Sequence, residues 1–114
     1  MSYRRPEPLG KQHRVDDFDC GESALDDWLK RHALGAQASG SARVFVATLD
    51  DGETAVGYYA LAAAQVAPEE ATARALKGQP RTRPIPAILL ARLAVDREHQ
   101  RAGLGRSLLQ DVLL

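Results

Sequence analysis

The residues best suited to chemistry in this chain form a short polar segment with two glycines, Gln100-x-x-Gly103-x-Gly105. Glycine lets the backbone turn tightly and come close to a ligand. An apolar run ends at Val95 just before the segment, and leucines at helical spacing follow it. We therefore expect a strand, a loop and then a helix. The N–H groups of the loop and the positive end of the helix would converge there, which suits a pyrophosphate.

Two arginines and a serine flank the segment. Arg101 and Arg106 could reach further phosphates, and Ser107 either bonds a phosphate or caps the helix. The segment is not a P-loop, because it lacks Gly-x-x-x-x-Gly-Lys-Ser/Thr. A dinucleotide-binding fingerprint is excluded as well, since it needs a third glycine and a following strand with an acidic residue.

Charge is distributed unevenly along a chain whose formal net charge is zero. Residues 1–70 carry 7 Lys/Arg and 12 Asp/Glu, a net charge of −5, and residues 71–114 carry 8 against 3, a net charge of +5. All but three of the 15 basic residues are arginines, whose planar fork binds phosphates bidentately. The second half therefore indicates either a phosphate-bearing partner or a solvated surface rich in arginine.

Other reactive side chains show no pattern of a site. Cys20 is the only cysteine, which excludes a disulfide framework and a multi-cysteine zinc site. No histidine or acidic residue is spaced to activate it, so we expect a small buried residue. His13, His32 and His99 lack the spacing of metal ligands, and we predict no metal site.

Length and composition predict one domain over residues 1–114, with 45% apolar and 26% charged residues. No apolar run approaches the roughly 20 residues of a membrane span. The N-terminus has no hydrophobic stretch after its arginines, so no secretory signal is expected. We expect a cytoplasmic protein.

Breakers and apolar spacing divide the first half into an arm, a helix and a hairpin. The arm extends to about Gly21, and the helix is expected from Ser23, in a capping box with Asp26, to Leu34, where Gly35 ends it. Trp28 is on the apolar face of this helix and is expected in the core. Strands over 42–49 and 55–66, joined by a turn at 50–52, form the hairpin, with Tyr58 and Tyr59 on opposite faces.

The second half predicts a short helix over 68–76, a loop over 78–86 and a strand over 87–95. This strand is nearly all apolar, as is typical of a strand covered on both faces. Leucines and a valine then mark one face of a final helix, and the chain stops without a residue that would end it. The apolar positions of this helix are Leu104, Leu108, Leu109, Val112 and Leu113.

The segment at 100–105, preceded by Leu93-Ala94-Val95, resembles the pyrophosphate loop of the GCN5-related N-acetyltransferases, Gln/Arg-x-x-Gly-x-Gly/Ala after strand four. The resemblance implies an α/β (α+β) fold with a mixed, mostly antiparallel sheet flanked by helices, and acetyl-CoA as the cofactor. It implies that the end of the strand offers backbone groups to the pantetheine arm. The cofactor-binding residues would be Leu93, Ala94, Val95, Gln100, Arg101, Ala102, Gly103, Leu104, Gly105, Arg106 and Ser107.

A narrower resemblance covers most of the chain. Phe18-Asp19-Cys20-Gly21, Leu25-Asp26-Asp27-Trp28-Leu29 and Leu90-Ala91-Arg92-Leu93-Ala94-Val95-Asp96 are similar to the acetyltransferase toxins of bacterial toxin–antitoxin modules. The resemblance implies acetylation of the α-amino group of aminoacyl-tRNA, with translation arrest relieved by a small ribbon-helix-helix antitoxin. Arg81, Arg83 and Arg92 are the candidates for tRNA phosphates, and exposed arginines without a partner are the alternative.

The strand over 87–95 has no carboxylate to deprotonate an amine, only Arg92. A lysine, with a pKa of about 10.4, would need such a base, whereas α-amino groups have a pKa near 8 and an aminoacyl ester a lower one. The residue types therefore favour an aminoacyl ester as the acceptor.

The toxin family has a tyrosine well beyond the pyrophosphate helix that protonates the CoA thiolate, and nothing follows Leu114 here. We expect the N-terminal two-thirds of the domain, with no catalytic residue within the chain and no transfer activity of its own. A homodimer that covers the last helix is one expectation. The other functions left open are acetylation of a small amine or a protein N-terminus, and a non-catalytic module that binds acetyl-CoA or an antitoxin.

Overall fold

A computed structural model describes residues 3–66 and 85–113. Its elements are β1 (Glu7–Pro8), α1 (Ser23–Asp27), the π-helix η1 (Trp28–His32), α2 (Ala33–Ser39), β2 (Arg43–Thr48), β3 (Ala55–Val66), β4 (Ile85–Val95), the 3-10 helix η3 (Gln100–Ala102) and α3 (Leu104–Leu113). None of these helices is long and apolar enough to cross a membrane. The helix predicted over 68–76 lies outside the described residues, as does the loop expected over 78–86 except for its last two residues, which begin β4.

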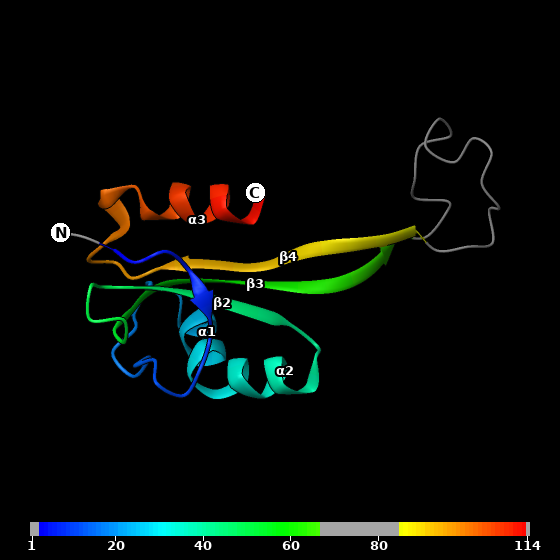
Figure 1. Ribbon diagram of the computed structural model, residues 1–114, viewed down its shortest axis with the longest axis horizontal. Coiled ribbons are helices and arrows are strands. Elements are labelled where there is room, and N and C mark those ends of the chain that lie inside the picture. Colours follow the sequence, from blue (N-terminus) through cyan, green and yellow to red (C-terminus); the bar gives the residue numbers. More distant parts are fainter. Residues whose placement is uncertain (1–2, 67–84, 114) are drawn as a thin grey trace.

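The four strands form one sheet in the order β1-β2-β3-β4, and every neighbouring pair is antiparallel. The helices α1, η1 and α2 cover one face of the sheet, and α3 lies on the other (Figure 1). The predicted α/β class and the hairpin of β2 and β3 are confirmed. Within the described strands no pair is parallel, so the sheet there is antiparallel throughout rather than mixed.

Side chains alternate between two cores along β3. Tyr58 is fully buried in the core on the side of α1 and η1, together with Phe18 and Leu29. Tyr59 points to the opposite face and packs in the second core with Leu108 of α3. The predicted opposite orientation of the two tyrosines is confirmed, because successive strand residues face opposite sides of a sheet.

The first helical segment is longer than predicted. It passes through η1 and ends at Gly40, which adopts the left-handed conformation with φ of 81°. Gly35 does not end it but lies exposed inside α2. Glycine within a helix costs only about 1 kcal/mol relative to alanine, so the apolar contacts of the helix outweigh it.

The predicted capping box at the start of this segment is wrong. Glu22 is the N-cap residue, and no side chain caps the helix. The Asp26 carboxylate is buried and accepts a hydrogen bond from the backbone N–H of Cys20 at 2.9 Å. The acidic side chain therefore fixes the arm that precedes the helix instead of the helix end.

The N-terminal arm contains a short strand, β1, at the edge of the sheet. β1 pairs with β2, and the side chain of Gln37 in α2 ties the two together. Its Nε2 donates to the carbonyl of Leu9 at 2.6 Å, and its Oε1 accepts from the N–H of Val44 at 2.8 Å.

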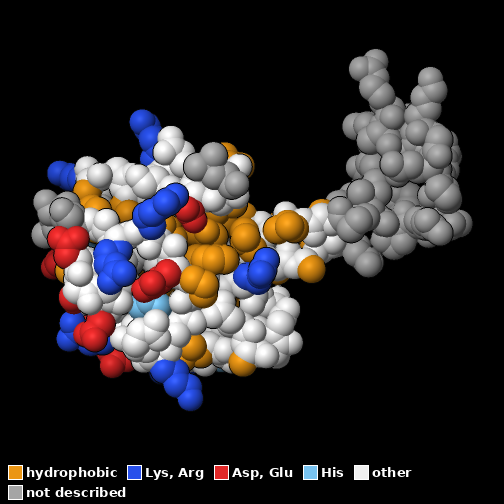
Figure 2. Space-filling view, viewed as in Figure 1, with side chains coloured by type: hydrophobic (Ala, Val, Ile, Leu, Met, Phe, Trp, Pro, Cys, Tyr) orange, Lys and Arg blue, Asp and Glu red, His pale blue; other side chains and the backbone are white. Residues whose placement is uncertain are grey.

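Strand β4 is not covered on both faces, contrary to the prediction. Ile88 and Leu89 are 78% and 54% exposed, and Leu109 and Leu113 of α3 are 42% and 77% exposed. β3 and β4 extend past the end of β2 (Figure 1), so the described elements leave this part of the strands bare. Figure 2 shows hydrophobic side chains gathered between α3 and the projecting part of the hairpin.

Candidate functional site

The predicted strand, loop and helix are present in the described structure. β4 ends at Val95, a turn and η3 follow, and α3 begins at Leu104. Gly103 joins η3 to α3 with φ of 80°, a left-handed conformation that disfavours any residue with a Cβ. A Cβ built on Gly103 would meet nothing within 4 Å, so the space in front of this turn is open.

Gly105 is needed less than the sequence suggests. Its backbone is not left-handed, and an added Cβ would lie 3.6 Å from Cγ2 of Val95, an ordinary contact. Of the two glycines, only Gly103 has the left-handed dihedral that demands glycine for the turn, and the close approach of Gly105 to the cofactor stays a prediction.

The first turn of α3 presents backbone donors. The first N–H groups of a helix have no partner inside it. Here the N–H of Ser107 bonds the carbonyl of Gly103 at 3.2 Å, which leaves the N–H groups of Leu104, Gly105 and Arg106 as the donors at the helix start. Together with the positive end of the helix, they form a place for an anion.

The side chain of Gln100 braces the loop. Its Nε2 donates at 3.0 Å to the carbonyl of Val95 at the end of β4, and at 3.0 Å to the carbonyl of Cys20 before α1. The amide therefore holds three parts of the chain in register. Sequence reasoning assigned Gln100 to the cofactor, but in this structure its side chain acts on the protein backbone.

The end of β4 exposes backbone groups along its outer edge. Asp96 donates its N–H to the carbonyl of Val56 at 2.8 Å, and Ala94 lies opposite Tyr58. Because antiparallel pairs alternate, the N–H and C=O groups of Leu93 point away from β3. The N–H of Val95 points away from β3 in the same way, its carbonyl accepts from Gln100, and the groups of Ala94 face β3. That Leu93, Ala94 and Val95 contact the cofactor stays a prediction.

Residues 9–113 match the family described as acetyltransferase (GNAT). The chain belongs to the acetyltransferase (GNAT) family. The tRNA-acetylating toxin of Mycobacterium tuberculosis is 43% identical to it over 111 residues, which are 97% of this chain and 64% of that protein. The chain thus spans slightly less than two thirds of the length of this relative.

Solved structures show the same fold. AtaT complexed with acetyl-methionyl-tRNAfMet superposes with a TM-score of 0.82 at 24% identity, over 97% of this chain and 66% of that one. A mutant AtaT toxin bound to the C-terminus of the antitoxin AtaR and acetyl-CoA has a TM-score of 0.73 at 26% identity, over 95% of this chain and 62% of that one.

The other residues of this GNAT chain that were predicted to bind the cofactor surround the start of α3. Arg101, Ala102 and Arg106 are exposed around the helix start. The hydroxyl of Ser107 donates to the carbonyl of Gly103 at 3.3 Å. This bond is not the predicted cap, because a capping oxygen accepts from a backbone N–H, and the bond to a phosphate stays a prediction. The two arginines remain available to an anion at the start of α3.

The histidine of the GNAT loop is fixed by the N-terminal arm. His99 is 8% exposed, and its Nδ1 is 2.9 Å from the hydroxyl of Tyr3. Ligand atoms of Asp96, Glu98 and His99 lie within 4.8 Å of one another. We assign no metal to them, because the Asp96 carboxylate already accepts hydrogen bonds from the N–H groups of Asp19 and Glu98.

The tyrosines of the described chain are committed to structural bonds. The hydroxyl of Tyr58 donates to the carbonyl of Leu25 at 2.8 Å, and that of Tyr59 donates to the carboxylate of Asp111. Burial raises the pKa of Tyr58 well above its ordinary range, and burial with the bond to Asp111 does the same for the pKa of Tyr59. Neither is placed as a proton donor.

The remaining residues singled out in the sequence are Cys20 and the three arginines predicted to bind tRNA phosphates. Cys20 is half-buried against the first core, and burial raises the pKa of its thiol, which makes it a poor nucleophile. Arg92 lies over the ring of Trp28, with 4.6 Å between the guanidinium carbon and the ring centroid. Arg81 and Arg83 lie outside the described residues.

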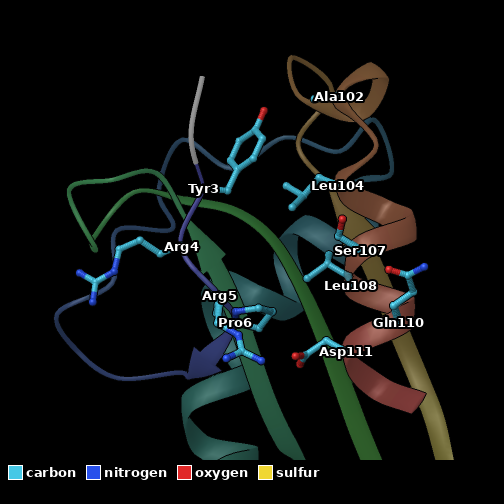
Figure 3. A pocket seen from close by; sticks show the side chains of 10 residues that line it. All are labelled: Tyr3, Arg4, Arg5, Pro6, Ala102, Leu104, Ser107, Leu108, Gln110 and Asp111. Atoms are coloured by element: carbon cyan, nitrogen blue, oxygen red, sulfur yellow. The ribbon is translucent and has the colours of Figure 1, made fainter. Parts of the chain in front are cut away.

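The structure has a cavity of about 370 Å³ between the N-terminal arm and α3 that the sequence does not predict. Figure 3 shows Tyr3, Arg4 and Arg5 on the arm side and Ser107 and Asp111 on the helix side. The sequence carries no local signal for it, because its two walls are about 100 residues apart in the chain.

Proposed function

We propose that this chain is the cofactor-binding part of an N-acetyltransferase toxin that acetylates the α-amino group of aminoacyl-tRNA and so blocks translation. The observation that carries the proposal is the start of α3, where a left-handed Gly103 leaves the first N–H groups of the helix facing open space at the end of β4. The identity of 43% to a tRNA-acetylating toxin supports the substrate.

Acetyl-CoA fits the donors at this position. Its pyrophosphate would accept hydrogen bonds from the N–H groups of Leu104, Gly105 and Arg106, and Arg101 would add positive charge. The outward backbone groups of Leu93 would meet the pantetheine arm. When bound, acetyl-CoA supplies the activated acetyl thioester.

The proposed acceptor amine follows from the absence of a carboxylate base in β4. Within 87–95 the only ionisable side chain is Arg92, so the strand offers no carboxylate base. An α-amino group beside an ester loses its proton far more readily than a lysine, whose pKa is about 10.4. An aminoacyl ester therefore suits a site without a strong base better than a lysine does.

The test is transfer of labelled acetyl groups from acetyl-CoA to charged tRNA, with the same tRNA uncharged as the control. We expect product only on the charged tRNA, using a chain extended through the complete domain. The absence of transfer by 1–114 alone stays a prediction and is measured beside it. Equal labelling of a small amine or a peptide N-terminus would contradict the choice of substrate.

The partner proposed for this toxin is a ribbon-helix-helix antitoxin, and its place of action is the cytoplasm, where charged tRNA is found. An AtaT structure contains the C-terminus of the antitoxin AtaR, which supports a protein antitoxin. A homodimer that covers the exposed leucines of α3 remains part of the proposal.

A further inference from the structure

Three side chains form a stack on the face of the sheet opposite α3. The ring of Trp28 lies nearly parallel to that of Tyr58, at 14° with 6.0 Å between centroids, and the Arg92 guanidinium carbon lies 4.6 Å from the centroid of the indole. Tyr58 is fully buried and its hydroxyl is bonded to Leu25. The Trp28 ring therefore packs against a tyrosine that is itself fixed in the core.

The stack orients a cation without neutralising it. A cation over an aromatic face is attracted by the ring quadrupole, which uses none of the N–H donors of a guanidinium in hydrogen bonds. Within residues 3–66 and 85–113, no carboxylate lies within ion-pair distance of Arg92. Arg92 is half-buried, so its position is defined by Trp28 rather than by solvent.

The position of Arg92 relates it to the cofactor loop. Arg92 precedes Val95 by three residues on the same strand, and three strand residues span roughly 10 Å. It shares its face of the sheet with Ala94, whereas α3 is on the other face. A phosphate bound to Arg92 would lie within one nucleotide's reach of the end of β4.

We propose that Trp28 is a positioning residue that holds the Arg92 guanidinium ready to bind a phosphodiester of the single-stranded 3′ end of the tRNA, beside the aminoacyl group. This inference rests on the proposed function and names the part of the substrate that the site grips. A guanidinium already held in place loses little freedom when it binds, and its planar fork matches phosphate oxygens.

Trp28 is the only tryptophan, so its fluorescence reports directly on this site. The probes are an RNA minihelix that ends in a single-stranded 3′ ACCA and a blunt duplex with the same stem. We expect the minihelix to change the Trp28 emission on titration and the blunt duplex to leave it unchanged. A change of equal size with both probes would overturn the assignment to the single-stranded end.

Variants of the two residues are compared by the anisotropy of the labelled minihelix. Arg92→Gln should weaken binding about 10- to 100-fold, as for a lost charged hydrogen bond, and lower the slope of log affinity against log salt by about 1. Trp28→Leu should weaken binding roughly 3- to 10-fold, whereas Trp28→Phe, which keeps a ring face, should restore most of it. Recovery with phenylalanine separates positioning from general packing.

Arg14→Gln is the matched control, because Arg14 is exposed and already paired with Asp51 at 3.1 Å. It should leave binding of the minihelix unchanged. If the wild-type chain binds the minihelix and neither Arg92→Gln nor Trp28→Leu weakens it, this inference is wrong while tRNA binding stands. If the wild-type chain binds neither RNA, the proposed substrate fails with it.

Discussion

Leu108 of α3 packs directly over Gly57 of β3: a Cβ added to Gly57 would lie 2.9 Å from Cδ1 of Leu108. The same Cβ would lie 3.4 Å from the backbone carbonyl of Ala94 and from Cδ2 of Leu104. The missing side chain of Gly57 is therefore what lets α3 approach the sheet, and this approach places the start of the helix next to the end of β4.

Gly57→Ala should destabilise the fold. Leu108 is fully buried and cannot move aside freely, so we expect a loss of about 1 to 3 kcal/mol in the free energy of unfolding. Urea denaturation followed by far-UV circular dichroism measures it. The control is Gly35→Ala, which meets nothing within 4 Å on an exposed helix and should gain about 0.5 to 1 kcal/mol. A loss at both positions would contradict the packing argument.

The two glycines of the cofactor loop should behave differently. Gly103→Ala places a Cβ on a left-handed residue, which costs about 1 to 2 kcal/mol and should weaken acetyl-CoA about 10-fold if the loop relaxes away from that conformation. Gly105→Ala meets only an ordinary contact and should bind as the wild type does. Calorimetric titration with acetyl-CoA compares them. Equal affinities for all three chains would show that the left-handed turn is not part of the binding site.

The arm that carries β1 should loosen in acid. Nε2 of His13 is 2.8 Å from Oε1 of Glu7, and this hydrogen bond lowers the pKa of the Glu7 carboxyl below its ordinary value. A lowered folded-state pKa adds stability that is complete above the unfolded pKa of about 4.3 and is lost as the pH falls through the folded value. Glu7 is partly exposed, so solvent screens the effect.

In Glu7→Gln, the urea midpoint should therefore be lower than in the wild type at pH 6, and the difference should shrink as the pH falls below about 4. The comparison is a series of urea titrations at fixed ionic strength. A difference that stays constant down to pH 2 would show that the carboxylate charge contributes nothing.

The hydroxyl of Tyr58 should matter for stability and not for RNA. Tyr58→Phe removes the donor to the carbonyl of Leu25 and leaves that carbonyl without this partner, at a cost of about 1 kcal/mol. The phenyl ring still supports Trp28, so affinity for the RNA minihelix should not change. Thermal unfolding and anisotropy report the two quantities separately, and weaker RNA binding at unchanged helicity would place the hydroxyl in the binding site.

The amino-acid sequence by itself determined the parts of this protein that local rules govern. Apolar alternation and the turn at 50–52 predict the hairpin, and Gly103 before leucines at helical spacing predicts the loop and α3. Each depends on residues within a few positions of one another. The exposed apolar side chains of β4 show where this reasoning ends, because an apolar run cannot reveal which neighbours are present to cover it.

Only the tertiary structure decided which distant residues meet. The Gln100 amide donates to the carbonyls of Val95 and Cys20. The Arg92 guanidinium lies over the Trp28 ring, and Leu108 packs over Gly57. Several of these partners are more than 50 residues apart, and each contact depends on how the helices settle on the two faces of the sheet. That placement follows from the packing of whole side-chain layers, a property that no local spacing encodes.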